Sequence, residues 1–543
     1  MTDSIAIQTA EPVVGPDVHA QEIVQCQGNA FVTRIRLVDG RVDEAWSTGR
    51  MMRNMNMLLR GELDERGRPG FVSQAHCLCN DGHALAAIRA VEDLAGVGLP
   101  DSAILVRKLV QSMRCMQEHL LHFYQFHFSD WVSLEAALRV DPAKAASMAS
   151  LPGEDTAYFR SVQDQLRLMV EDRSTTSSYT EDEGRYQGPD ALHLLLHGHA
   201  LASIQIGASL QAALGLLECG PKGFKAYRIG GLPDDLDLST ATLEQLGMIL
   251  EECREFIGTI FPADLARLAR VYSPWTELGR GSSFLTWDGA VACGLLVAGG
   301  GLPWRLLQPD SAVIREECEP DWNHEDSHRY RLFAGRSEPL FRWGDGNYFW
   351  LSAPRHGNSA CEVGPLARVM GGLLNGQGGM EQIVSRVLDD GGLSLEALNS
   401  TMGRVLSRGI EASVLMDSIL EGVDELECTL VDEGRHNVDF TLPTAGIGVG
   451  RVEVPRGTLT HTIRWGQGRI MSHDYLIPSL WNFSPRDARG ELGPLERALR
   501  GTPVINPDSP VEILRTLHEF DPCNTCHVVI ENRDTGRTTL TTA

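Results

Sequence analysis

Two short stretches near opposite ends of the chain carry the residues best suited to bind a metal. The first, QAHCLCNDGH at positions 74–83, contains two cysteines and two histidines, and the second, DPCNTC at positions 521–526, contains two cysteines. Thiolates are soft ligands that favour zinc, copper(I), iron in iron–sulfur clusters and other thiophilic metals. The candidate ligands are His76, Cys77, Cys79, Cys523 and Cys526.

The spacing of these cysteines does not match an ordinary structural zinc site. Such sites usually repeat a C-x2-4-C pair within a short stretch of sequence, whereas here the first pair is C-x-C and the two pairs lie far apart. A metal buried between two parts of a large fold would explain the spacing, and so would coincidence. Spacing alone leaves both open. Most of the other cysteines stand singly in apolar runs and are interpreted as small buried side chains.

The composition excludes some classes of function. The 543 residues carry a net charge of −24, which argues against a nucleic-acid-binding protein, because such a protein needs a basic face for the phosphates. The most apolar run, residues 290–303, is too short for a membrane-spanning helix. The first residues have neither the cationic nor the apolar region of a signal peptide. No direct membrane span is therefore expected.

The elements that must position these cysteines are predicted to be mainly helices. Apolar residues at helical spacing run through much of 50–270 and return in 365–388 and 394–424. Alternation around Asp39-Gly40 predicts a hairpin over 29–46. Short strands are expected over 277–360 and in the C-terminal part, where a last helix stops before Pro522. The pattern predicts a predominantly helical α+β fold with small sheets.

Several longer motifs make the chain resemble the large subunit of nickel–iron hydrogenases. The most specific are NFSPRDARGELGPLERALRGTPVINPDSPVEILRTLHEFDPCNTC at 482–526 and VEVPRGTLTH at 452–461. HLLHFYQFHFSDWVSLEAALRVDPAKAA at 119–146, YRIGGLP at 227–233 and CNDGHALAAIRAVEDL at 79–94 add to them, in the family's order. The resemblance implies a hydrogenase large-subunit-like fold, with a central helix bundle and small peripheral antiparallel sheets. The expected organisation is a weakly ordered segment 1–25, one domain 26–529 and a tail 530–543.

The resemblance also implies a buried nickel–iron centre whose iron carries carbon monoxide and cyanide. Cys523 matches a terminal nickel thiolate, and Cys79 and Cys526 match the two thiolates that bridge nickel and iron. His83 matches the family histidine beside a bridging sulfur. Cofactor binding is therefore expected from Cys79, Cys523 and Cys526.

Three charged residues are expected to act next to this centre. Arg456 and Asp521 match the charged pair that arches over the metals, and Glu118 stands where the family often has an aspartate. A guanidinium there could polarise or position hydrogen, or a base, above the metals. Catalytic roles are thus expected for Arg456, Asp521, Glu118 and His83.

The first motif departs from the family at a nickel ligand. In the register R-x-C-x-x-C-x-x-x-H, the arginine falls on Gln74 and the first cysteine on His76, while Cys77 comes one place late. Either the imidazole of His76 or the shifted Cys77 replaces the missing thiolate, or His76 only fills space and the protein supplies three ligands. An imidazole would leave the site with one less negative charge and a different redox potential.

Further departures affect the proton relay and a magnesium site. The family's relay glutamate falls on Gln27, which cannot take up and release a proton at neutral pH. Two family magnesium ligands fall on Asn56 and Val529, which weakens the expectation of a bound magnesium ion. The family histidine at this position also marks the cleavage point of a maturation protease. Because valine replaces it here, the tail after Val529 is expected to be retained.

Three hypotheses about function follow. The first is a divergent hydrogenase that converts hydrogen to protons and electrons, with the protons leaving through Glu118 or the pair His119 and His122. The second is an oxidoreductase with a non-hydrogen substrate, and the third is a sensor or scaffold subunit with little turnover.

All three hypotheses imply an iron–sulfur small subunit, because this chain has no further cysteine run for clusters, and the first implies hydrogenase maturation proteins. In the family the small subunit usually carries the export signal. The chain is therefore expected in the cytoplasm or wherever that subunit carries it, the membrane or the periplasm.

Overall fold

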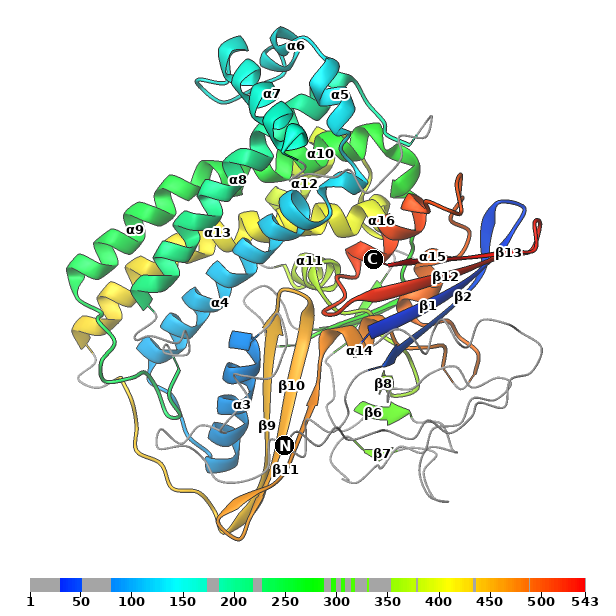
Figure 1. Cartoon of the computed structure of the whole chain (residues 1–543). Helices are drawn as coiled ribbons and strands as arrows, with labels where there is room; N and C mark the ends of the chain where they lie inside the picture. The colour runs from blue at the N-terminus through cyan, green and yellow to red at the C-terminus, as the bar shows by residue number, and fades with distance from the viewer. Residues whose placement is uncertain are drawn as a thin grey trace, which may run out of the picture.

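The computed structural model shows a predominantly helical α+β fold (Figure 1), which confirms the predicted class. The described residues are 30–50, 80–172, 185–217, 227–287, 353–376, 379–432, 436–487 and 489–542, with four short strands between 294 and 331. His76, Cys77 and Cys79 lie outside the described residues, as do Gln27, Asn56 and Gln74.

Long helices form the body of the described part. The α-helices are α3 (Asn80–Ala95), α4 (Asp101–Leu121), α5 (Leu134–Arg139), α6 (Pro142–Ala146), α7 (Thr156–Glu171), α8 (Asp190–Leu217), α9 (Thr240–Glu255), α10 (Phe261–Val271), α11 (Pro365–Leu374), α12 (Met380–Gly391), α13 (Thr401–Asp432), α14 (Pro478–Asn482), α15 (Pro494–Leu499) and α16 (Val511–Glu519). Single π turns follow α4 (His122–Phe126) and α9 (Phe256–Ile260), and short 3-10 turns cover Phe128–Asp130, Ser273–Thr276 and Leu395–Leu398.

The strands form four small sheets. They are β1 (Ala30–Val38), β2 (Arg41–Arg50), β3 (Ser283–Thr286), β4 (Gly294–Ala298), β5 (Trp304–Leu307), β6 (Ile314–Glu317), β7 (Tyr330–Arg331), β8 (Ala353–His356), β9 (Ala445–Val454), β10 (Gly457–Gly466), β11 (Arg469–Leu476), β12 (Cys526–Asn532) and β13 (Arg537–Thr542). Among the described strands the orders are β13-β12-β1-β2, β11-β10-β9, β3-β4-β5 and β7-β6-β8.

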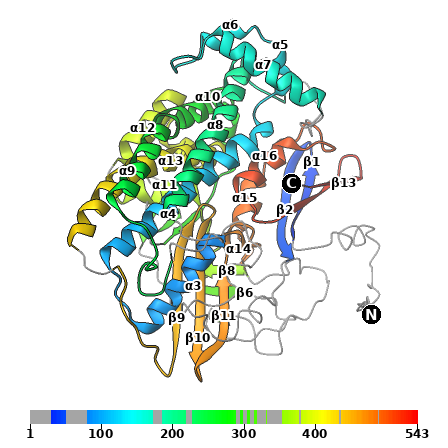
Figure 2. The same ribbon diagram turned by 60° about the vertical axis from the view of Figure 1, so that its left-hand side comes forward.

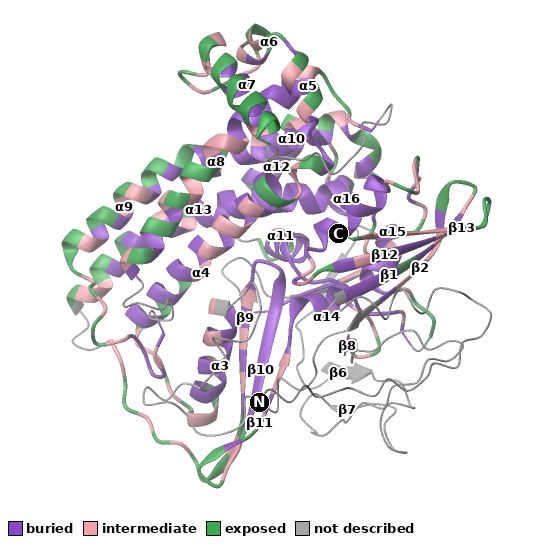
Figure 3. Ribbon diagram, in the orientation of Figure 1, coloured by how far each residue is buried: buried purple, intermediate pink, exposed green. Residues whose placement is uncertain are grey.

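The helix bundle is built around α13, which packs against α4, α9, α10 and α11. The middle of the bundle consists mostly of buried residues, while the ends of α9 and α13 reach solvent (Figure 3). The expected single helix over 365–388 is wrong: α11 ends at Leu374 and α12 begins at Met380. Gly376 and Gly379 between them have φ of 64° and 78°, a left-handed backbone that breaks the helix.

The N- and C-terminal parts of the described chain meet in one sheet (Figures 1 and 2). The predicted hairpin is present, since β1 and β2 pair around Asp39 and Gly40, whose φ angles are 51° and 67°. β12 then pairs with β1 in parallel, with Phe31 opposite Cys526, so this sheet is not wholly antiparallel as expected. The pairing fixes the second cysteine motif against the first hairpin.

Glycines let α3 lie unusually close to the β9-β10-β11 sheet. A Cβ added at Gly450 would be 1.8 Å from the carbonyl oxygen of Ala86, and one at Gly448 would be 1.9 Å from that of Ala90. Both glycines are on β9, two positions apart, so they share the face that α3 covers. This close approach sets the position of the helix that carries His83.

One described helix, α8, is long and apolar enough to cross a membrane by length and composition. In the fold it contacts α4, α5 and α9. Core helices pass the same test, so α8 by itself is weak support for a membrane span.

Candidate metal centre

Arg456 brings together three of the residues that the resemblance assigns. It lies in the turn between β9 and β10, and its guanidinium is 4% exposed. Its Nη1 donates to Oε2 of Glu118 on α4 at 2.7 Å. Its Nε lies 3.0 Å from Oδ1 of Asp521, just after α16. The guanidinium therefore sits between two carboxylates that lie far apart in the sequence.

Glu118 and Asp521 differ in their surroundings. Burial raises the pKa of Glu118, Arg456 lowers it and the nearby Asp521 charge raises it again. Asp521 has a φ of 48°, a left-handed conformation rare for a residue with a side chain. It also faces Arg408 on α13, with 3.6 Å between Arg408 Nη1 and Asp521 Oδ2. Two arginines thus flank the Asp521 carboxylate.

The two cysteines of the second motif follow directly. Cys523 is 6% exposed, and its backbone N–H donates to Oγ of Ser479 at 3.2 Å. Cys526 is fully buried at the first position of β12, with its sulfur 3.9 Å from the hydroxyl of Thr33. Burial raises the pKa of the Cys526 thiol to about 12. A sulfur in these surroundings is a thiolate at neutral pH only when a metal cation balances its charge.

The described half of the ligand set therefore fits a soft metal ion. Both cysteines of the C-x-x-C motif are buried. The positively charged Arg456 and Arg408 both contact Asp521, two residues before Cys523. Sulfur donors select thiophilic metals, nickel and iron among them. The other half of the set, Cys79 with His76 or Cys77, lies outside the described residues.

His83 is placed on α3 and contacts β10, the strand that begins next to Arg456. Its Nδ1 is 2.9 Å from Nε2 of His461, and the residue is 4% exposed. Burial lowers its pKa to about 4, so the imidazole is neutral at pH 7. The structure thus joins His83 to β10, the strand that follows Arg456.

A small cavity lies beside Arg456. Its lining includes Arg404, Arg408, Arg456, Glu362, Glu519 and Asp521. Burial raises the pKa of Glu519 to about 7, although Arg408 Nε lies 3.3 Å from its Oε2 and lowers it. The charged lining makes this cavity suited to polar guests such as water.

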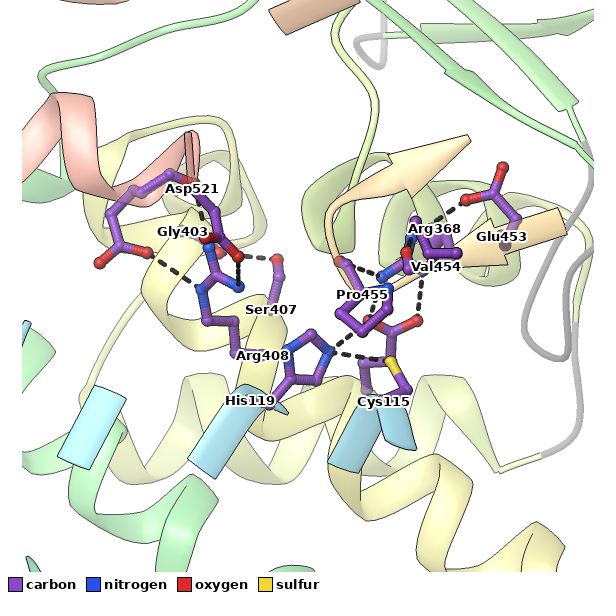
Figure 4. Close-up of polar contacts among 12 residues, drawn as sticks. Cys115, His119, Arg368, Gly403, Ser407, Arg408, Glu453, Val454, Pro455 and Asp521 are labelled. Carbon is purple, nitrogen blue, oxygen red and sulfur yellow. Dashed lines mark hydrogen bonds and ion pairs between the residues drawn. The ribbon is translucent and has the colours of Figure 1, made fainter. Parts of the chain in front are cut away.

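Sequence reasoning missed the buried charges that support these residues. Arg368 on α11 reaches Glu453 on β9 (Figure 4). It also pairs with Glu411 on α13. Arg404, Arg408 and Glu411 lie at spacings of four and three within the apolar helix α13. That spacing, with charges on the buried side of a helix, is a signal that could have revealed them.

The histidines proposed as a proton exit are held in other contacts. His119 Nε2 is 2.8 Å from Oε2 of Glu411, and Cys115 Sγ is 3.3 Å from the same nitrogen. His122 Nε2 donates to the carbonyl of His518 at 3.0 Å, and burial lowers its pKa well below the usual value. Cys115, His119 and Glu411 are close enough to share an ion, but the guanidinium of Arg368 already neutralises Glu411.

Known proteins share this architecture. The family model for nickel-dependent hydrogenases matches residues 53–529. The chain is 30% identical to the uptake hydrogenase large subunit of Azotobacter chroococcum mcd 1, over 96% of each chain. It is 29% identical to the Hydrogenase-1 large chain of Escherichia coli (strain K12), over 95% of this chain and 94% of that one.

Solved structures agree with the sequence comparison. A variant of the NiFeSe hydrogenase from Desulfovibrio vulgaris Hildenborough has a TM-score of 0.70 at 22% identity, covering 91% of this chain and 98% of that chain. The NiFeSe hydrogenase of Desulfomicrobium baculatum has a TM-score of 0.70 at 21% identity, covering 90% and 95%. The hydrogenase large-subunit-like fold is confirmed.

Proposed function

This chain belongs to the nickel-dependent hydrogenase family, and from that premise we propose that it is the catalytic large subunit of a hydrogen-activating oxidoreductase. The observation that carries the proposal is the Arg456 guanidinium, which is held between Glu118 and Asp521. Asp521 lies two residues before the buried Cys523. This arrangement places a positive charge and N–H donors close to two buried cysteines, which suits chemistry on a metal held by their sulfurs.

In this proposal Cys523 and Cys526 would hold nickel and iron together with Cys79 and either His76 or Cys77. When bound, the nickel–iron centre, with carbon monoxide and cyanide on iron, supplies a Lewis acid and a redox couple for splitting hydrogen. Arg456 places fixed N–H donors and a positive charge at the centre without reorganising, since both its carboxylate partners hold it.

Glu118 is the proposed first proton acceptor of this chain. Its Oε2 accepts from Arg456, which leaves Oε1 to take up a proton. Because burial raises its pKa, Glu118 binds a proton more readily than an exposed glutamate does. Asp521, flanked by Arg456 and Arg408, is placed to orient the guanidinium of Arg456.

The proposal includes an iron–sulfur small subunit as electron acceptor, and maturation proteins that insert the metals. The small subunit would also decide whether the complex stays in the cytoplasm or reaches the membrane or periplasm. We further propose that the tail 530–543 is retained. Val529 lies in the middle of β12, and β13 pairs with β12 beyond it. Cleavage after Val529 would remove a strand from the sheet that holds Cys526.

The test is infrared spectroscopy with metal analysis on the purified complex. We expect sharp carbon monoxide and cyanide bands and about one nickel per chain, with nickel largely lost in Cys526→Ser because one ligand is removed. Cys361→Ser is the matched control: Cys361 is equally buried, and burial also raises its pKa to about 12. Absence of the bands, with zinc or no metal, would contradict the proposal.

The departures at Gln27, Asn56, His76 and Val529 favour a second candidate, a hydrogenase-like subunit that senses or scaffolds, or that oxidises another substrate. Hydrogen–deuterium exchange with gas separates these candidates. A metal-loaded complex that exchanges no hydrogen would support the second. Mass spectrometry of the intact chain tests the tail, since a mass that ends at Val529 would show that it is removed.

A further inference from the structure

A second group of side chains suited to bind a metal lies where the turns after α4 meet α16. His127 and Asp130 come from those turns, and His518 comes from the last turn of α16. One donor atom from each residue lies within 4.8 Å of the other two. His518 Nδ1 is 2.6 Å from Asp130 Oδ2, and the rings of His127 and His518 stack with 4.1 Å between their centroids. Residues far apart in the sequence thus bring three ligand side chains together.

The backbone around this cluster is held by hydrogen bonds that do not use the three ligand atoms. The backbone N–H of His127 donates to the carbonyl of His122 at 3.0 Å, which closes the π turn after α4. The carbonyl of Asp130 accepts from Arg515 Nε on α16 at 2.7 Å, and the carbonyl of His518 accepts from His122 Nε2 at 3.0 Å. The turns and α16 are therefore joined before any ion binds, which reduces the ordering that binding must supply.

The charges around the cluster favour a bound cation. Although burial lowers the pKa of His518, the Asp130 carboxylate raises it above its ordinary value. Glu519 and Asp521 act on His518 in the same direction. Burial and the charge of His518 lower the pKa of His127 well below its usual value, so the His127 ring is neutral and offers a lone pair. The cluster already carries a positive charge beside carboxylates, and a metal ion can take the place of the proton on His518.

The donor types and their spacing suit a first-row transition metal ion. Two imidazoles and one carboxylate are ligands that zinc takes readily, with further positions left for water. Donors bound to one tetrahedral zinc lie about 3.5 Å apart, so donors within 4.8 Å of one another need only small side-chain rotations to share an ion. His127 is only partly buried and lies near the exposed residues Phe126 and Ser129, which gives an ion a route from solvent.

We propose that His127, Asp130 and His518 form a second metal site, which binds a divalent transition metal ion of the zinc type. The ion is held by one nitrogen of each histidine and a carboxylate oxygen of Asp130. Binding forms three donor–metal bonds and releases a proton of His518 to solvent, and water completes the coordination. The inference does not rest on the proposed function, because no cysteine of the candidate metal centre is among the ligands.

The two elements that this ion joins also position the carboxylates around Arg456. Glu118 is on α4, and Asp521 lies two residues after the end of α16. Both carboxylates contact the Arg456 guanidinium. A bound ion therefore restrains the segments that carry these carboxylates. Because it binds the folded protein, it should also raise the melting temperature of the complex increasingly with its concentration.

The first test is equilibrium dialysis of the purified complex against Zn²⁺. The decisive variant is His127→Phe, because phenylalanine keeps a ring against His518 but has no nitrogen donor. The matched control is His436→Phe, because His436 is also partly buried and bonds to Ser102, outside the cluster. We expect the wild-type complex to bind about one zinc per chain whose dissociation constant rises at least about tenfold in His127→Phe and is unchanged in His436→Phe. Equal zinc affinity in His127→Phe and wild type overturns the site.

Two further measurements separate loss of a ligand from a folding defect. In EDTA, wild type and His127→Phe should melt at the same temperature, and added zinc should raise that temperature in wild type only. X-ray absorption at the zinc edge of the wild-type complex should show imidazole nitrogen and carboxylate oxygen at about 2.0–2.2 Å and no sulfur. This spectrum needs no variant, so it decides the assignment even where His127→Phe is destabilised. Sulfur at about 2.3 Å, or a wild-type complex that binds no zinc, overturns the proposal.

Discussion

Arg368 bonds two carboxylates in opposite electrostatic situations, and this difference gives a quantitative prediction. Glu411 receives two hydrogen bonds from Arg368, and its Oε2 lies 2.8 Å from His119 Nε2. Although burial raises its pKa, Arg368 and His119 outweigh this effect and lower it to about 2. Burial raises the pKa of Glu453, by contrast, more than Arg368 lowers it. Ionised Glu411 therefore stabilises the fold, and ionised Glu453 does not.

The magnitude follows from the pKa of Glu411. A fall from 4.5 to about 2 is worth about 3 kcal/mol, because each tenfold change in proton affinity is about 1.4 kcal/mol. Breaking a buried ion pair costs a similar amount, about 3–5 kcal/mol. We therefore expect Glu411→Gln to lower the free energy of unfolding by about 3 kcal/mol at pH 7, and Glu453→Gln by about 1 kcal/mol, the cost of one imperfect hydrogen bond.

The direction of the pKa shift of Glu411 also predicts how the stability it contributes changes with pH. Because the folded pKa of Glu411 lies below the unfolded value of 4.5, the stability it contributes is complete above about pH 4.5 and is lost as the pH falls toward 2. Urea unfolding of the complex, followed by tryptophan fluorescence, should show the gap between wild type and Glu411→Gln at pH 7 and a smaller gap below pH 4. A loss in Glu453→Gln as large as that in Glu411→Gln, or a gap that widens in acid, would refute the reasoning.

Three further predictions test the surroundings of the site. Arg456→Lys should keep the metal but lower hydrogen oxidation about a hundredfold, because lysine lacks the planar, fixed fork of donors that arginine holds between the two carboxylates. Near-normal rates would count against the role of Arg456. The raised pKa of Glu519 makes the wild-type protein lose stability as the pH rises from about 4.5 to 7. Glu519→Gln should therefore reduce the pH dependence of the free energy of unfolding in this range, and an unchanged slope in urea titrations would contradict this. Gly450→Ala should destabilise the fold by about 3 kcal/mol through its clash with Ala86, whereas Gly466→Ala, with only ordinary contact at 3.6 Å, should change the melting temperature little; equal effects would exclude close packing of α3 as the cause.

Local patterns accounted for much of the fold. Alternation around Asp39-Gly40 predicted the first hairpin, and the helix before Pro522 ends at Glu519 as expected. The helical segment 365–388 was only partly right, because apolar periodicity continues across a gap that Gly376 and Gly379 interrupt. The spacing of apolar residues indicates which face of a helix is buried, and it can continue unchanged across a short break in the helix.

Much of the site followed from motifs that the sequence preserves. The motifs around Arg456 and Asp521 marked both residues, and the structure joins them with Glu118. The spacing of charges in α13 could have indicated that Arg408 is buried. Its pairing with Glu519 and Asp521 could not be predicted, since the partner of a buried charge is set by the tertiary contacts. The role of each assigned residue stays a prediction until the metal content and the variants are measured.

The sequence by itself determined the family, the helical class and the residues most suited to metal chemistry, because these depend on local spacing and on motifs that survive as short strings. Only the tertiary structure decided how distant segments meet. The contacts of His461 with His83 and His473 depend on the register of β10 and β11 and on the glycines that admit α3. Hydrogen bonds depend on tenths of an ångström and on direction, and the folded backbone alone sets these.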